Sequence, residues 1–64
     1  MSEIPEKVYA ILLTDRGQSP VEIYRQVDQG SLVSTRFALR NLIKEGRCRY
    51  EGDDLFRRYF KVEK

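Results

Sequence analysis

The chain has 64 residues, of which 41% are hydrophobic and 34% are charged, and its net charge is +2. These values are typical of one small globular domain, here residues 1–64, and they exclude a disordered chain. No apolar run approaches the roughly 20 residues that cross a bilayer. The first residues also lack the basic and then apolar order of a signal peptide, so we expect a cytoplasmic protein with no membrane partner.

The chain contains no histidine and a single cysteine, Cys48. The serine–histidine and cysteine–histidine catalytic arrangements are therefore excluded, and a disulfide or metal site has too few ligands. A carboxylate-pair or lysine enzyme stays open in principle, but a chain of this length has little room for a deep pocket. We therefore expect no enzyme, no cofactor, no metal and no small-molecule effector. Cys48 is assigned to the core.

Charge is distributed unevenly along the chain. Residues 1–30 carry three cations and five acids, whereas residues 31–64 carry nine cations and five acids. This asymmetry indicates that one side of the folded domain faces a polyanion.

The first predicted helix begins at Pro5, because proline suits the first turn, where its missing N–H is not needed. Apolar residues at helical spacing then form an inward stripe, which Tyr9 and Leu13 widen. The members of this stripe are Ile4, Val8, Ile11 and Leu12. Gly17 is expected to be the turn residue that ends the helix.

A second helix is predicted from the run Ser19-Pro20-Val21-Glu22. This run combines an N-cap serine, a proline at the first helical position and the reciprocal glutamate of a capping box. The helix extends to about Val27 and buries Ile23, Val27 and part of Tyr24. Residues 28–30 form a tight connection containing glycine, so this helix and the next have helix-turn-helix geometry.

A third helix over residues 31–45 is bounded by an N-cap at Ser31 and a left-handed residue at Gly46. Its inward face is apolar at the spacing of an amphipathic helix and consists of Leu32, Thr35, Ala38, Leu39, Leu42 and Ile43. Its outward face holds three cations, an amide and no acid, and consists of Arg36, Phe37, Arg40, Asn41 and Lys44. Such a helix can pack by one face and contact phosphates and bases by the other.

After Gly46 the pattern becomes alternating, which predicts a hairpin of strands 47–51 and 55–62 around a loop at 52–54. We place Cys48 and Tyr50 inward. The more apolar set of the second strand, Phe56, Arg58, Phe60 and Val62, is placed inward with them, which requires a loop of three or five residues. The outward face then holds Arg47, Arg49, Arg57, Tyr59 and Lys61. A minor strand near Gln18 is also expected.

Residues 35–47 resemble the recognition helix of winged helix regulators, particularly the N-terminal DNA-binding domains of the GntR family. Those domains carry a similar Thr-Val-Arg-x-Ala-Leu-x-x-Leu-x-x-Glu-Gly run. The resemblance implies a mainly α winged helix-turn-helix fold, three helices plus a two-stranded wing, with DNA contacts from Arg36 and Arg40. The chain departs from the family at Val33, where arginine is frequent, and in its acidic loop at 51–54. We also expect no counterpart of the effector domain that follows in that family.

These features predict a small DNA-binding protein, a transcriptional regulator that places helix 31–45 in the major groove of double-stranded DNA, as a homodimer or with a protein partner. The expected DNA contacts are Ser34, Arg36, Phe37, Arg40, Asn41, Lys44, Arg49 and Arg57. The alternative is a winged helix that binds another protein through Phe37, Tyr59 and the acidic loop, and does not bind DNA on its own.

Overall fold

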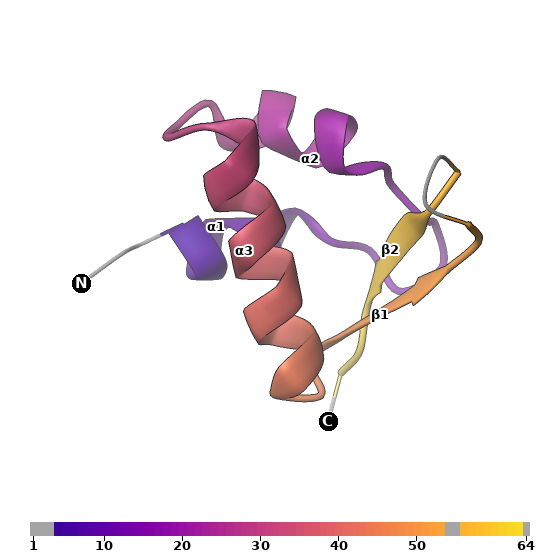
Figure 1. The fold of residues 1–64 in the computed structure, drawn as a ribbon. Coiled ribbons are helices and arrows are strands. Elements are labelled where there is room, and N and C mark those ends of the chain that lie inside the picture. Colours follow the sequence, from indigo (N-terminus) through magenta and orange to yellow (C-terminus); the bar gives the residue numbers. More distant parts are fainter. Residues whose placement is uncertain (1–3, 54–55, 64) are drawn as a thin grey trace.

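The structure is a computed structural model that describes residues 4–53 and 56–63, and within them it contains three helices followed by a two-stranded antiparallel sheet (Figure 1). The elements are α1 (Ile4–Ile11), α2 (Pro20–Val27), α3 (Leu32–Lys44), β1 (Cys48–Glu51) and β2 (Arg58–Lys61). α2 lies near the beginning of α3, and the hairpin lies beside its second half. This arrangement confirms the predicted fold class, a mainly α domain with a β-hairpin wing.

The capping signals of α2 and α3 are formed as predicted. Ser19 Oγ accepts a hydrogen bond from the Glu22 amide at 3.2 Å, and the Glu22 carboxylate accepts one from the Ser19 amide at 3.2 Å. At α3, Ser31 Oγ accepts a hydrogen bond from the Ser34 amide at 3.2 Å. Gly46 leaves the helix with φ at 75°, as a left-handed C-terminal residue does. These ends depend on residues close in sequence, so local chemistry determines them.

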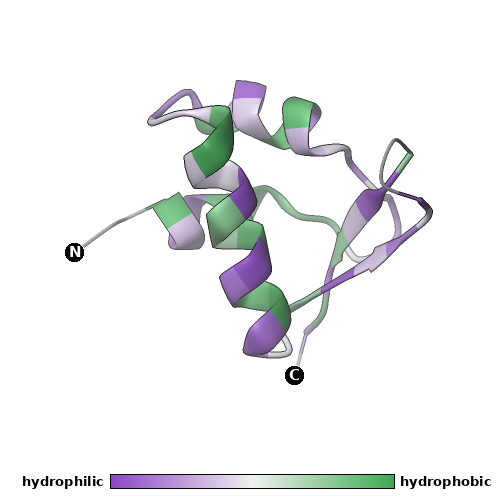
Figure 2. Ribbon diagram, viewed as in Figure 1, coloured by the Kyte–Doolittle hydropathy of each residue, from purple (hydrophilic) through white to green (hydrophobic). Residues whose placement is uncertain are grey.

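The core lies where the three helices meet. Its fully buried side chains are Val8, Leu12, Ile23, Thr35, Leu39 and Leu42. These residues come from the predicted inward faces, and Cys48 joins them at 4% exposed, as predicted. Hydrophilic and hydrophobic stretches alternate along α3 in Figure 2, as they do in a helix that packs by one side.

The predicted end of the first helix is wrong. α1 ends at Ile11, and Leu13, which was expected to widen the inward stripe, is 44% exposed. Gly17 is buried, and its φ is not positive. A Cβ atom on Gly17 would lie 2.7 Å from Arg58 Cβ and 2.8 Å from Phe60 Cζ. Glycine therefore serves the close approach of β2 here and does not end a helix.

The predicted register of the hairpin is also wrong. Tyr50 pairs with Tyr59 and Cys48 pairs with Lys61, so these four residues share one face of the sheet. Residues 52–57 connect the strands, an even number instead of the expected three or five. Tyr59, placed outward from the sequence, is 8% exposed, whereas Phe56, placed inward, is 78% exposed. Residue 54, the predicted end of the loop, and residue 55, the predicted start of the second strand, lie outside the described residues.

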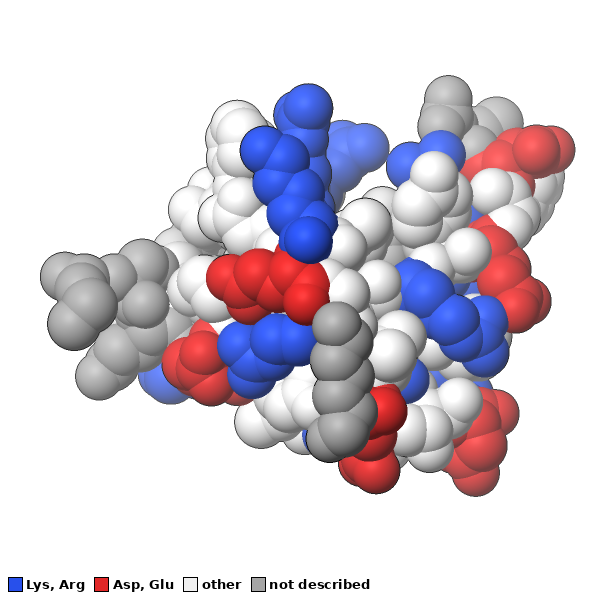
Figure 3. All heavy atoms as spheres, turned by 90° about the horizontal axis from the view of Figure 1, so that it is seen from below, with Lys and Arg blue, Asp and Glu red and all other residues white. Residues whose placement is uncertain are grey.

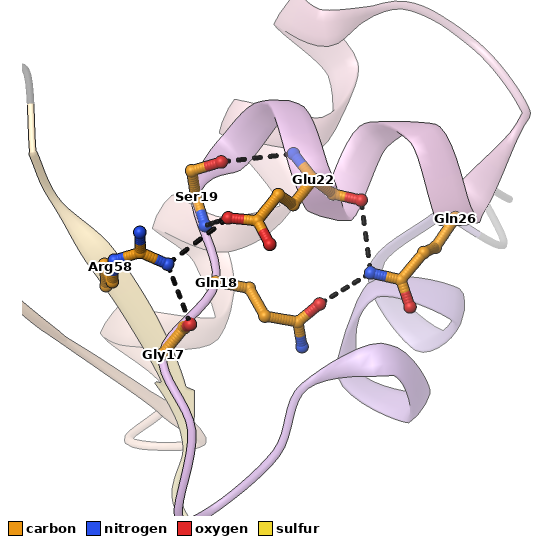
Figure 4. Close-up of polar contacts among 6 residues, drawn as sticks. All are labelled: Gly17, Gln18, Ser19, Glu22, Gln26 and Arg58. Atoms are coloured by element: carbon orange, nitrogen blue, oxygen red, sulfur yellow. Dashed lines mark hydrogen bonds and ion pairs between the residues drawn. The ribbon is translucent and has the colours of Figure 1, made fainter.

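The register follows from a second partner of β2. The Gln18 backbone amide donates to the Tyr59 carbonyl at 3.2 Å, and the Tyr59 backbone amide donates to the Gln18 carbonyl at 2.9 Å. The minor strand expected near Gln18 is therefore a single bridge. Figure 4 shows the polar side chains of this junction. Arg58 Nη1 donates to the Gly17 carbonyl at 3.2 Å, and Gln26 donates to the Gln18 side chain. β2 is therefore paired with β1 along one edge and with the segment between α1 and α2 along the other.

Candidate nucleic-acid interface

The outward face of α3 is exposed as predicted. Arg36, Phe37, Arg40, Asn41 and Lys44 are all exposed side chains. The three cations among them form no ion pair with any other residue that the structure describes. In Figure 3 a cluster of lysine and arginine side chains projects at the upper edge of the molecule, and acidic side chains lie directly below it. This face of α3 is therefore free to meet a polyanion.

Most arginines of the hairpin region, in contrast, are paired with acids. Arg47 Nη1 lies 3.4 Å from carboxylate oxygens of both Glu6 and Glu45. Likewise, Arg49 pairs with Glu51, and Arg58 Nη1 lies 3.3 Å from a Glu22 oxygen. These acids offset much of the positive charge that the sequence places after residue 46. The cations of α3, in contrast, have no acid paired with them among the described residues.

A groove with a volume of about 510 Å³ runs between α3 and the hairpin. We call it the α3–hairpin groove. Its described lining comes from α3 and from the hairpin region, and comprises Val33, Arg36, Phe37, Arg40, Ile43, Tyr50, Arg57 and Tyr59. Three of these residues are cations, three are aromatic and none is acidic. The groove combines positive charge with flat apolar surfaces.

The aromatic wall of the groove is built by the observed hairpin register. The rings of Tyr50 and Tyr59 lie 6.1 Å apart between centroids, at an interplanar angle of 45°. Tyr59 is nearly buried, whereas Tyr50 is 46% exposed. The guanidinium of Arg57 lies over the Tyr50 ring, with its Cζ atom 4.2 Å from the centroid. This cation–π contact holds the guanidinium plane at the groove.

The structure brings together four of the predicted contact residues and separates the others. Arg36, Phe37, Arg40 and Arg57 all line the groove. The predicted grouping of Arg49 with Arg57 is wrong: Arg49 lies opposite Phe60 on the other face of the hairpin, with its guanidinium 4.1 Å from the centroid of that ring.

The remaining predicted contacts lie on α3 outside the groove. Ser34 is in the first turn, where its Oγ lies 3.2 Å from Ser31 Oγ. Asn41 and Lys44 are exposed on the second half of the helix and do not line the groove. They extend the outward face without contributing to the hollow.

Sequence reasoning missed Val33, Ile43, Tyr50 and Tyr59 as lining residues. The two tyrosines were missed because the hairpin register was shifted by one residue, which moves every side chain of a strand to the other face. The signal that points to them is the predicted minor strand near Gln18, since its pairing with Tyr59 fixes that register.

Comparison with protein-family models, with curated proteins and with solved structures finds no match to this chain. None of the helices in the described residues is both long and apolar enough to cross a membrane. Within residues 4–53 and 56–63, no group of three or more histidine, cysteine, aspartate or glutamate side chains is placed to hold a metal ion.

Proposed function

We propose that this chain is a small DNA-binding protein, a transcriptional regulator that places α3 in the major groove of double-stranded DNA. The observation that carries the proposal is the unpaired positive charge of Arg36, Arg40 and Lys44 on a helix whose opposite face is buried. α3 follows the short helix α2 and a turn, and the hairpin follows α3 in the chain. This order matches that of helix-turn-helix proteins, whose second helix lies in the major groove.

The cations of α3 divide the work of recognition by position. Arg36 and Arg40 lie one helical turn apart, and each guanidinium fork can bridge the O6 and N7 acceptors of a guanine. Lys44 is one turn further and is suited to a phosphate, because an ammonium acts as a point charge. The row from Arg36 to Lys44 extends about 12 Å along the helix, at about 1.5 Å per residue.

Titration of a labelled random duplex, followed by fluorescence anisotropy at low and moderate salt, tests this proposal. Arg36→Ala and Arg40→Ala should each weaken binding, because each removes a cation from the face that meets the duplex. At a preferred site, selected from a random pool, Arg36→Ala should cost about 1–3 kcal/mol and blur the preference.

Arg16→Ala is the charge-matched control for that titration. Arg16 is exposed and directly precedes Gly17, which packs against the Arg58 and Phe60 side of β2, away from the groove. Its loss should therefore leave duplex binding unchanged. If the Arg36 and Arg40 variants bind as the parent does, or if all three variants weaken binding equally, α3 is not the DNA-reading element.

We also propose that two protomers occupy one symmetric site, because a single short module contacts one half-site. Sedimentation with a symmetric duplex should then give two protomers per duplex, and a tight one-to-one complex would contradict this stoichiometry.

A second candidate function is protein recognition without DNA binding. The observation that favours it is the exposure of two phenylalanines, Phe56 at 78% and Phe37 at 58%, since large exposed apolar side chains mark protein contacts. Parent protein that fails to bind the duplex even at low salt would support this candidate over the DNA-binding one.

A further inference from the structure

We propose that the α3–hairpin groove accepts an unpaired nucleobase, so that the protein binds single-stranded or extruded bases as well as the duplex. This inference rests on the proposed function, because it assumes that the ligand is a nucleic acid. It adds a ligand class that a helix inserted in a major groove does not require.

The exposed aromatic rings of the groove are the first observation behind this proposal. Phe37 is 58% exposed and Tyr50 is 46% exposed, and both line the same hollow. The Phe37 side chain has no polar atom that could hydrogen-bond to the edge of a base pair. In the major groove it could make only an apolar contact with a thymine methyl group. A stacked base, however, offers the Phe37 ring a flat partner, and on the Tyr50 side it can stack on the Arg57 guanidinium that covers that ring. Stacking of this kind tolerates any base, because every base has a π face.

The guanidinium of Arg57 supplies a second flat surface. It is held over the Tyr50 ring at 4.2 Å, and an arginine plane stacks on an unstacked base as an aromatic ring does. The groove volume of about 510 Å³ lies within the range of about 300–1,000 Å³ that encloses small organic ligands. The hollow is therefore of a size and chemistry to take a base removed from its stack.

The charges around the groove complement the phosphates that flank such a base. Arg36 and Arg40 lie on either side of Phe37 in the sequence of α3, and both line the groove without an ion pair among the described residues. No acid is part of the described lining. Cations beside aromatic platforms are the combination by which proteins hold single strands. An acidic peptide would use the same cations, but it offers no π face to these rings.

The test compares three fluorescein-labelled ligands by anisotropy at one salt concentration. They are a thymidine oligomer of about ten nucleotides, within the usual site sizes of about 4–16, an oligomer of the same length made of abasic units, and a blunt random duplex. The abasic oligomer retains the phosphates and removes the bases. We expect the parent to bind the thymidine oligomer about tenfold more tightly than the abasic one, because one stacked base contributes about that factor.

Phe37→Leu and Tyr50→Leu retain an apolar side chain and remove a ring. Each should lower affinity for the thymidine oligomer about tenfold and leave affinity for the abasic oligomer unchanged. Tyr50→Phe retains the ring and should bind as the parent does, which separates loss of stacking from loss of fold. The matched control is Phe56→Leu, because Phe56 is equally aromatic, is exposed and does not line the groove.

Equal binding of the thymidine and abasic oligomers by the parent overturns the inference, as do Phe37→Leu and Tyr50→Leu variants that bind like the parent. The duplex distinguishes this failure from failure of the proposed function. If binding of the duplex depends on Arg40 and the thymidine oligomer binds no more tightly than the abasic oligomer, only the inference about the groove fails. If none of the three ligands binds, both proposals fail. If the thymidine oligomer binds and the duplex does not, the groove proposal holds and the duplex proposal fails.

Discussion

Replacing Gly17 by alanine tests whether the close approach of β2 to residues 17–18 holds the hairpin in place. The backbone of Gly17 does not adopt a positive φ, so alanine meets no conformational penalty at this position. At such a position the substitution normally stabilises a protein by about 0.4–1 kcal/mol, because it reduces the entropy of the unfolded chain. The lower entropy of the unfolded chain therefore predicts a more stable protein, whereas the contacts of the new methyl group predict a less stable one.

The distances decide the expected sign. The new methyl carbon would lie 2.7 Å from Arg58 Cβ and 2.8 Å from Phe60 Cζ, well inside ordinary contact between carbon atoms. The Phe60 ring can turn away by rotation of its side chain, but Arg58 Cβ is bonded directly to the backbone, so β2 must shift away from Gly17. Such overpacking costs about 1–3 kcal/mol. For a domain of this size, each kcal/mol lowers Tm by about 4–8 °C.

Thermal unfolding of Gly17→Ala, followed by circular dichroism, gives the primary measurement. We expect Tm to fall by about 5–20 °C. Phe60→Leu in the same background supplies the control, because removal of the ring opens space for the methyl group. The double variant should therefore be more stable than the sum of the two single changes predicts.

A Gly17→Ala protein that melts at the parental temperature or above it would refute this account of Gly17. Additive effects of Gly17→Ala and Phe60→Leu would show that the ring is not the obstacle.

Three further predictions concern the stability of variants at two buried residues and at one helix cap. Thr35 Oγ1 is buried with no hydrogen-bond partner among the described residues, so Thr35→Val should raise the free energy of unfolding by about 1 kcal/mol in urea titration, and a decrease would contradict this. The hydrogen bond from the Ser19 amide lowers the pKa of Glu22, so its stabilising effect is lost as pH falls through that lowered value. Glu22→Gln should therefore show a smaller loss of stability on acidification than the parent, and equal losses would exclude the cap as the cause. Burial raises the pKa of the Cys48 thiol to about 11. Because the unfolded thiol ionises near pH 8.5, the parent should lose stability relative to Cys48→Val as pH rises from about 9 to 11, whereas parallel curves would argue against a buried thiol.

The helices could be predicted from the sequence because their signals are local. The capping box at Ser19 and Glu22, the N-cap at Ser31 and the left-handed Gly46 each involve residues a few positions apart. The period of α3 also separated its buried face from its exposed cations correctly. Gly17 misled the prediction of the end of α1, because a glycine required for close packing and one required for a turn look alike in sequence.

The register of the hairpin could not be derived from alternation alone. β2 carries aromatic residues on both faces, Tyr59 and Phe60, so apolar content favours neither arrangement strongly. The deciding contact is the pairing of Tyr59 with Gln18, which is distant in sequence. Arg36, Phe37 and Arg40 could be identified as site candidates from the period of α3 alone. The groove wall formed by Tyr50 and Tyr59 could not be identified, because it depends on the hairpin register.

The bonds between Gln18 and Tyr59 also set an order for assembly during synthesis. Arg58 returns to Gly17 across 41 residues of sequence, while the caps of α2 and α3 each close within three residues. Local contacts form early because little chain entropy opposes them, and long closures come late. As the ribosome extends the chain, the helices therefore emerge with their caps in reach, but the backbone of Gln18 stays hydrated until β2 has left the exit tunnel. The groove beside α3 is therefore completed only after β2 has been synthesised.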